Sequence, residues 1–323
     1  MILNKIKYNY NIKLIDDHLN NENYEGVRNI IAKSASNESL YLDLLQYLEQ
    51  KLYQNKILRK VHNKRIVWIN SFDIADTKLV FNFLSFYFSN INLNSATFLN
   101  YNEQMQSFLK NPNLSHDGRR VSFEDMIIKS SLCQSDLLFK NDQFLILNSD
   151  MAFFETQTNK YFAYPETTST YFYIIRNPYQ LFLKYLDANN NFQEALNKIS
   201  NFGQDNGGDN GDENPFTTIF NQARQSWSIN AQSWTDSNVQ SAYNGKIIDY
   251  SSLQKSFEET LIEILFHLKQ SGLDFEMNYD LIKNYVQSHN VEEDAGVNLS
   301  NQEMKMITNS LDKSILSQYN YTF

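Results

Sequence analysis

The chain has 323 residues, of which 42% are hydrophobic and 14% aromatic, and its formal net charge is −9. This composition excludes a disordered chain, and the length allows one large α/β domain with a small appended module or two ordinary domains. The acidic balance argues against a general nucleic-acid-binding protein, which needs a basic surface to neutralise phosphates.

The N-terminal residues 1–16 alternate apolar and polar side chains, without the apolar core of roughly 7–15 residues that a signal peptide needs. The longest apolar stretch, residues 79–88, is shorter than the roughly 20 residues that cross a bilayer. We therefore expect a cytoplasmic protein with no membrane span.

Residues 11–60 show the apolar spacing of two or three short helices, clearest at Leu40, Leu44, Leu48 and Leu52. This pattern predicts a helical hairpin over residues 1–62, appended to an α/β domain over residues 63–323. One hairpin is too short for a repeat solenoid, so we interpret it as a cap packed on the main domain or as a remnant of a tetratricopeptide-like array. In a scaffolding protein it would supply the surface for a protein partner.

From Arg65 onward the pattern is typical of a parallel sheet with flanking helices. A β-type run at 66–69 is followed by a loop at 71–76 and a helical pattern from 79, which is the opening unit of such a sheet. Further strands are predicted at 144–147, 153–154, 171–175 and 246–249. Helices are predicted at 179–186, 216–234, 257–270 and 279–316, and a flexible glycine-rich loop at 203–214.

The single cysteine, Cys133, rules out a disulfide framework and a thiolate metal cluster within the chain. We expect it to be a buried free thiol. We also expect no bound metal.

The segment Tyr173-Ile-Ile-Arg-Asn-Pro-Tyr-Gln-Leu-Phe-Leu-Lys-Tyr185 resembles the cytosolic and bacterial sulfotransferase family. In that family an Arg at the end of a strand and a Ser eight residues later bind the 3′-phosphate of the donor, 3′-phosphoadenosine 5′-phosphosulfate. Arg176 matches the Arg, and Lys184 stands in place of the Ser. A lysine can also hold a phosphate as a point charge, so the resemblance implies that both residues bind the donor.

A second, weaker segment follows the same family order of a Trp-containing helix, a strand, a turn and a long helix. Trp227 and Trp234 lie in the helix, and Tyr250 and Leu253 match the family's Tyr-Glu-Asp-Leu turn. Serines replace both acids of that turn.

The phosphosulfate loop departs most from the family pattern. The family reads Ser-Tyr-Pro-Lys-Ser-Gly-Thr-Thr, whereas this chain reads Ser-Phe-Asp-Ile-Ala-Asp-Thr-Lys over residues 71–78. The resemblance implies donor contacts from Ser71 and Thr77, and makes Lys78 the candidate positive charge on the migrating sulfuryl. Asp76 replaces the glycine, and we expect it to cap the following helix, which fills the anion site with the protein's own carboxylate.

The catalytic base of the family, a His after Lys-Thr, is also replaced. The matching stretch is Glu155-Thr-Gln157, in which Gln157 cannot accept a proton usefully. Glu155 is the candidate base, provided that burial raises its pKa.

The resemblance implies a P-loop NTPase-like sulfotransferase fold. It also implies transfer of a sulfuryl group from the donor to a hydroxyl of an unknown acceptor, a small molecule, glycan or lipid. The alternative is a catalytically inactive, sulfotransferase-like binding or scaffolding protein, because the loop Lys and Gly and the His are all replaced. A third interpretation is an unrelated α/β protein in which Arg-Asn-Pro is coincidental.

Overall fold

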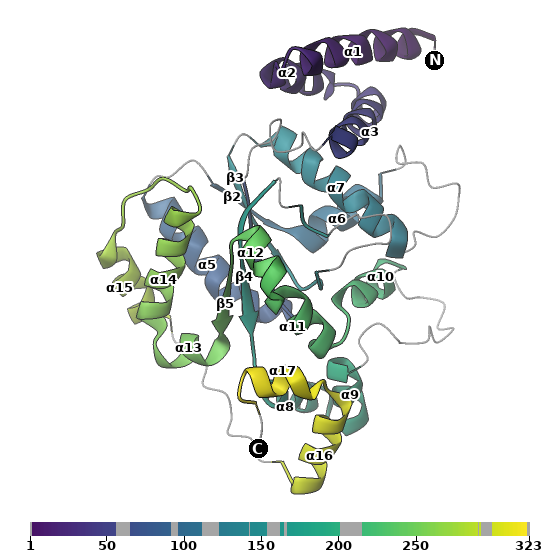
Figure 1. Ribbon diagram of the computed structural model, residues 1–323. Helices are drawn as coiled ribbons and strands as arrows, with labels where there is room; N and C mark the ends of the chain where they lie inside the picture. The colour runs from purple at the N-terminus through teal and green to yellow at the C-terminus, as the bar shows by residue number, and fades with distance from the viewer. Residues whose placement is uncertain are drawn as a thin grey trace.

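The computed structural model describes residues 2–55, 65–91, 96–111, 123–141, 143–153, 162–164, 167–200, 215–289, 291 and 299–321. Within these residues, five strands form one sheet in the order β2-β3-β1-β4-β5, and all neighbouring strands are parallel. The strands are β1 (Ile66–Ser71), β2 (Ala96–Asn100), β3 (Phe144–Ser149), β4 (Thr168–Ile175) and β5 (Gly245–Asp249). The predicted α/β class with a parallel sheet between helices is confirmed (Figure 1).

Both faces of the sheet are buried, as a parallel sheet with helical crossovers requires. Along β1, Ile66 and Trp68 belong to one hydrophobic core, and Val67 and Ile69 belong to the other. The second core is closed by α5 (Ile74–Asn90), α13 (Tyr250–Lys255), α14 (Phe257–Gln270) and α15 (Tyr279–Ser288).

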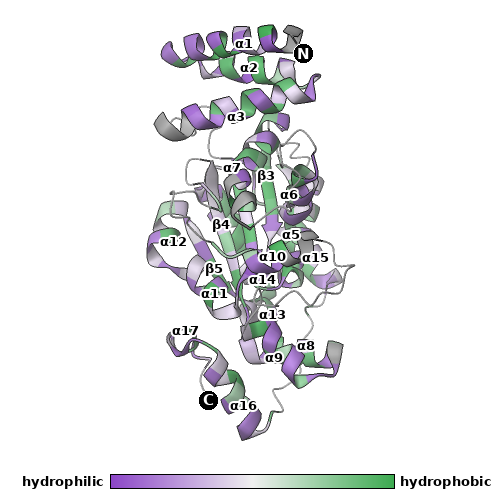
Figure 2. Cartoon of the chain, turned by 90° about the vertical axis from the view of Figure 1, so that its right-hand side faces the viewer, coloured by the Kyte–Doolittle hydropathy of each residue, from purple (hydrophilic) through white to green (hydrophobic). Residues whose placement is uncertain are grey.

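The larger core lies on the other face. It is closed by α6 (Tyr101–Leu109), α7 (Phe123–Lys140), α8 (Pro178–Asn189), α9 (Phe192–Ser200), α10 (Pro215–Arg224), α11 (Trp227–Thr235), α12 (Ser237–Tyr243), α16 (Asn301–Ser310) and α17 (Lys313–Gln318). Trp68, Trp227 and Trp234 are fully buried in it. In Figure 2 the ribbon of β3 is mostly green, the colour of hydrophobic residues, in keeping with the burial of this strand.

The N-terminal segment consists of α1 (Ile2–Asn20), α2 (Tyr24–Ser34) and α3 (Glu38–Asn55). The first helix packs on the other two, and both α2 and α3 contact α7. The predicted helical hairpin is therefore present as three helices, and its first helix begins at Ile2 rather than near residue 11. No helix in the described ranges is both long and apolar enough to cross a lipid bilayer.

The strand predictions at 66–69, 144–147, 171–175 and 246–249 are confirmed as β1, β3, β4 and β5. The strand predicted at 153–154 is wrong at Phe153, which is in no regular element, and Phe154 lies outside the described residues. The edge strand β2 was not predicted, because its side chains are only half-buried and its apolar run is short. The loop predicted at 203–214 lies outside the described residues.

Candidate functional site

A group of charged side chains lies at the carboxyl ends of β1, β3 and β4. In open parallel sheets the crevice outside the carboxyl ends of the strands is where ligands bind. Here the chain places three basic and three acidic side chains in that region, which we call the charge cluster: Arg176, Lys184, Arg224, Asp73, Asp76 and Asp150.

Arg176 follows the last residue of β4 and is held on three sides. Its Nη1 atom lies 2.7 Å from Oδ1 of Asp76, and the exposed fractions of the two side chains are 10% and 3%. Its guanidinium carbon lies 4.2 Å from the centre of the Tyr250 ring. The indole N–H of Trp227 donates a 3.1 Å hydrogen bond to its backbone carbonyl. Arg176 is therefore a largely buried, paired side chain at the position that the sequence predicts for an anion-binding arginine.

Lys184 lies two turns along α8, a helix that begins with Pro178 and is capped by the side chain of Asn177. Its Nζ atom is 2.7 Å from Oδ2 of Asp73 and 3.5 Å from Oδ1 of Asp76. The two residues predicted to bind a phosphate, Arg176 and Lys184, are thus brought together, and both face carboxylates of the β1–α5 segment.

The prediction that Asp76 caps α5 is wrong. The helix begins at Ile74, and Asp73 is its N-cap, with a carboxylate that accepts a 2.9 Å hydrogen bond from the N–H of Ala75. Asp76 lies in the first turn of α5. Its carboxylate accepts a charge-assisted hydrogen bond from the guanidinium of Arg176, the residue after β4. Its Oδ1 atom lies 2.7 Å from Arg176 and 3.5 Å from Lys184, the two residues that the resemblance assigns to the donor phosphate.

Ser71 and Thr77, the predicted donor contacts, are buried and bonded within the protein. The Ser71 hydroxyl donates to the carbonyl of Asp73 at 2.6 Å and accepts from its N–H at 3.1 Å. The Thr77 hydroxyl donates to the carbonyl of Ile74 at 2.7 Å and accepts from the Asn148 amide at 3.3 Å. Both hydroxyls therefore stabilise the turn between β1 and α5.

Of the two predicted catalytic residues, the structure describes only Lys78. Lys78 is exposed, whereas Asp76 and Thr77 beside it are buried. Glu155 lies outside the residues that the structure describes. The prediction that Lys78 places positive charge on a migrating sulfuryl therefore gains no support from a contact within the described residues, and the prediction for Glu155 stays a prediction.

Sequence reasoning missed the third ion pair, between Arg224 at the end of α10 and Asp150 after β3. Asp150 is fully buried, and its Oδ1 accepts a 2.7 Å hydrogen bond from the side-chain amide of Asn102. The Asn230 amide donates to the carbonyls of both Asp150 and Arg224, at 2.9 and 2.8 Å. The signal in the sequence was the polar run Asn148-Ser149-Asp150 at the end of an apolar strand.

Asn70, at the carboxyl end of β1, is fully buried, and neither atom of its side-chain amide has a hydrogen-bond partner within the described part of the chain. A buried polar group without a partner costs about 1–3 kcal/mol. The Asn70 amide therefore does not contribute to the stability of the fold, and such unfavourable buried groups are typical of functional regions.

Asp73 and Asp76 have opposite pKa shifts. Burial alone would raise the pKa of Asp73, but the Lys184 ammonium, the Ala75 N–H and the field of Arg224 together lower it. For Asp76, burial raises the pKa and outweighs the attraction of Arg176 and Lys184.

These shifts predict that the contributions of the two carboxylates to stability depend on pH in opposite directions. Ionised Asp73 stabilises the fold above the ordinary aspartate pKa of 3.8, and this stabilisation is lost as the pH falls through its lowered folded-state pKa. The stability deficit of Asp73→Asn should therefore shrink in acid. Because the pKa of Asp76 is raised in the folded state, protonation of Asp76 stabilises the wild-type fold as the pH falls from neutral toward 3.8. The variant Asp76→Asn lacks this gain, so its stability deficit should grow over that range. Urea unfolding of both variants and the wild type from neutral pH to below pH 3.8 checks this, since the Asp76 change falls above 3.8 and the Asp73 change below it. Parallel curves over the whole range would contradict it.

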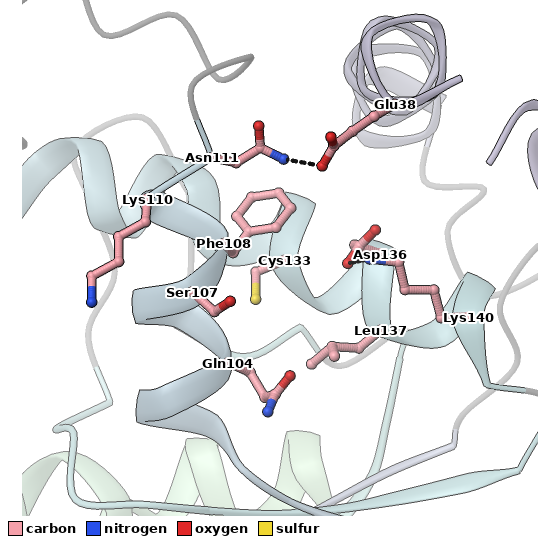
Figure 3. Close-up of a pocket in the computed structure, with 10 residues that line it drawn as sticks. All are labelled: Glu38, Gln104, Ser107, Phe108, Lys110, Asn111, Cys133, Asp136, Leu137 and Lys140. Carbon is pink, nitrogen blue, oxygen red and sulfur yellow. Dashed lines mark hydrogen bonds and ion pairs between the residues drawn. The ribbon is translucent and has the colours of Figure 1, made fainter. Parts of the chain in front are cut away.

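A cavity of about 310 Å³ lies elsewhere, between α3, α6 and α7 (Figure 3). Gln104, Ser107, Cys133 and Asp136 line it, and no member of the charge cluster does. Cys133 is a buried free thiol, as predicted, and its burial raises its pKa. This cavity is therefore separate from the region that the sequence assigns to the donor.

The charge cluster does not fit 3′-phosphoadenosine 5′-phosphosulfate in this arrangement. Arg176 and Lys184 already neutralise Asp76 and Asp73, and a phosphate beside them would face two carboxylates. Two like unit charges about 4 Å apart repel by about 4 kcal/mol at an effective dielectric constant near 20.

No model of a known protein family matches the chain, and no curated protein matches it.

Proposed function

We propose that the chain is a catalytically inactive, sulfotransferase-like protein that acts in binding or scaffolding. The observation that carries this proposal is the buried Arg176–Asp76 pair, whose atoms lie 2.7 Å apart. The residue best placed to hold a donor phosphate is neutralised by the residue that replaces the glycine of the family's phosphosulfate loop.

The order of the elements supports the sulfotransferase-like part of the proposal. A parallel sheet between helices is the architecture that the resemblance implies, and Arg176 comes directly after β4, with α8 starting two residues later. Trp227, from the second matching segment, donates a hydrogen bond to the Arg176 carbonyl. The two segments that carry the resemblance therefore meet in space.

The chemistry supports the inactive part. Sulfuryl transfer needs positive charge on the migrating group and a base for the acceptor hydroxyl. Lys78 is exposed, and Gln157 replaces the family's histidine. An active enzyme would also have to separate Asp73 and Asp76 from their cations before the donor could bind.

Calorimetric titration with adenosine 3′,5′-bisphosphate, the desulfonated donor, tests this proposal. We expect no binding to the wild type, because the cations of the site are already neutralised within the protein. The matched variant is Arg176→Ala, which should also show no binding. Micromolar binding by the wild type that Arg176→Ala abolishes would overturn the proposal in favour of a divergent sulfotransferase, and would justify a screen of hydroxylated acceptors.

A further inference from the structure

The outer side of α1 exposes two large hydrophobic side chains. Ile6 and Tyr10 are 61% and 63% exposed, more than any other large hydrophobic residue in the described part of the chain. Their spacing of four residues places them side by side on one face of the helix, and Lys13 continues that face three residues later. The opposite face, which includes the fully buried Ile15, packs on α2 and α3.

This patch is locally basic on an acidic protein. Lys5, Lys7 and Lys13 are all exposed, and no acidic residue precedes Asp16 in the helix. Asp16 is paired with Lys51 of α3, whose ammonium lies 3.5 Å from its Oδ1, and the exposed Asp17 follows it. The excess of positive charge on α1 is therefore confined to residues 5–13.

Figures 1 and 2 show α1 as the outermost layer of the N-terminal segment, with α2 and α3 between it and the sheet. The helices α8 and α17 lie at the opposite end of the molecule. Both helices that pack against the opposite face of α1 carry charges. In α2 they are Glu25, Arg28 and Lys33, which sum to one positive charge, and in α3 they are Glu38, Asp43, Glu49 and Lys51, which sum to two negative charges.

We propose that this face of α1, defined by Ile6, Tyr10, Lys5, Lys7 and Lys13, binds the surface of an anionic lipid membrane. Ile6 and Tyr10 would enter the region between the headgroups and the acyl chains, with the helix parallel to the surface. The three ammonium groups would reach the lipid phosphates. Since α1 is already folded against α2 and α3, this binding needs no ordering of the helix.

The composition of the patch favours a membrane over a protein partner. Lysine is depleted in protein–protein interfaces relative to the rest of the surface, whereas lysines beside aliphatic and tyrosine side chains are typical of interfacial helices. Attraction of lysines to an anionic leaflet also falls off within a Debye length, so it makes binding sensitive to salt.

Co-sedimentation of the full chain with phosphatidylcholine vesicles, with and without phosphatidylglycerol, tests the proposal. The wild type should bind only the vesicles that contain phosphatidylglycerol, and high salt should release it. Lys5→Glu/Lys7→Glu should bind more than about tenfold more weakly, since each lysine near an anionic surface contributes about fivefold. Ile6→Ser/Tyr10→Ser should also lose binding, because the apolar insertion is removed.

Matched controls use the same substitutions elsewhere on the surface. Phe266→Ser changes another exposed hydrophobic residue, and Lys255→Glu/Lys283→Glu changes the net charge by the same amount. Both should bind like the wild type, and circular dichroism should show that all variants keep their helices. An absence of wild-type binding, as expected if α1 serves a protein partner, would overturn the proposal. Equal losses in the control variants would also overturn it. Neither result depends on whether nucleotide binds at the charge cluster.

Discussion

Replacing Arg176 by methionine is expected to lower the free energy of unfolding by about 3 kcal/mol. Removing one partner of a buried ion pair leaves the other charge desolvated, and typically costs about 3–5 kcal/mol. Asp76 would be that stranded charge, since only 3% of its side chain is exposed. We expect the lower end of the range because the Lys184 ammonium, 3.5 Å away, still attracts it. Urea unfolding at neutral pH measures the change.

Two further variants make this result specific. Asp76→Asn/Arg176→Met removes both charges, and should lose less stability than Arg176→Met alone because no buried charge is stranded. Lys246→Met breaks a pair of similar length, 2.8 Å, with Glu263, whose side chain is 64% exposed. Its loss should stay below about 1 kcal/mol. An Arg176→Met deficit no larger than that of Lys246→Met would show that the buried pair contributes little to the fold.

The parts of the fold that could be predicted are those with a local signal. The strands β1, β3 and β4 are continuous apolar runs because both faces of the sheet are covered. The start of α8 was visible in Pro178, whose missing N–H is not needed in the first turn. The strand β2 has no such signal, since it lies at the edge of the sheet and all its residues are half-buried.

The partners within the charge cluster could not be predicted in the same way. Arg176 and Asp76 are 100 residues apart in the chain, and Lys184 and Asp73 are 111 apart. Pairs at such distances leave no periodic pattern, because they depend on which strands become neighbours. The same limit explains the error over the cap of α5. Two aspartates stand near the start of the helix, and the sequence alone does not show that Asp73 caps it while Asp76, in the first turn, pairs with Arg176.

Neutralising both carboxylates of the loop should turn the charge cluster into an anion-binding site. The wild-type cluster has three cations and three carboxylates, whereas Asp73→Asn/Asp76→Asn leaves only Asp150 and so carries two net positive charges. We expect this variant to be less stable than the wild type, and to regain stability when adenosine 3′,5′-bisphosphate binds. A ligand at a hundred times its Kd stabilises by about 2.7 kcal/mol. With an unfolding entropy of about 2.1 cal/mol/K per residue, this corresponds for a chain of 323 residues to a rise in Tm of about 4 °C.

Thermal unfolding with and without the nucleotide, at constant ionic strength, measures this rise. The wild type should show no rise in Tm, because Asp73 and Asp76 already neutralise Lys184 and Arg176. The control Asp274→Asn/Asp280→Asn removes two exposed carboxylates, so it has the same net charge without opening the charge cluster, and should also show none. An equal rise in both double variants would mean that overall charge, rather than the site, is responsible.

If the wild type binds no nucleotide, two interpretations stay open: an inactive sulfotransferase-like protein and an unrelated α/β protein. Comparing the nucleotide with inorganic phosphate separates them. A sulfotransferase-like site retains the shape for an adenosine bisphosphate once its internal anions are removed, so the nucleotide should act at lower concentration than inorganic phosphate does. In an unrelated α/β protein with a coincidental Arg-Asn-Pro, the freed Arg176 and Lys184 would attract both anions only as point charges. A variant stabilised by nucleotide and phosphate at the same concentrations would therefore favour coincidence. Selectivity for the nucleotide would support descent from a donor-binding protein whose site was closed by Asp73 and Asp76.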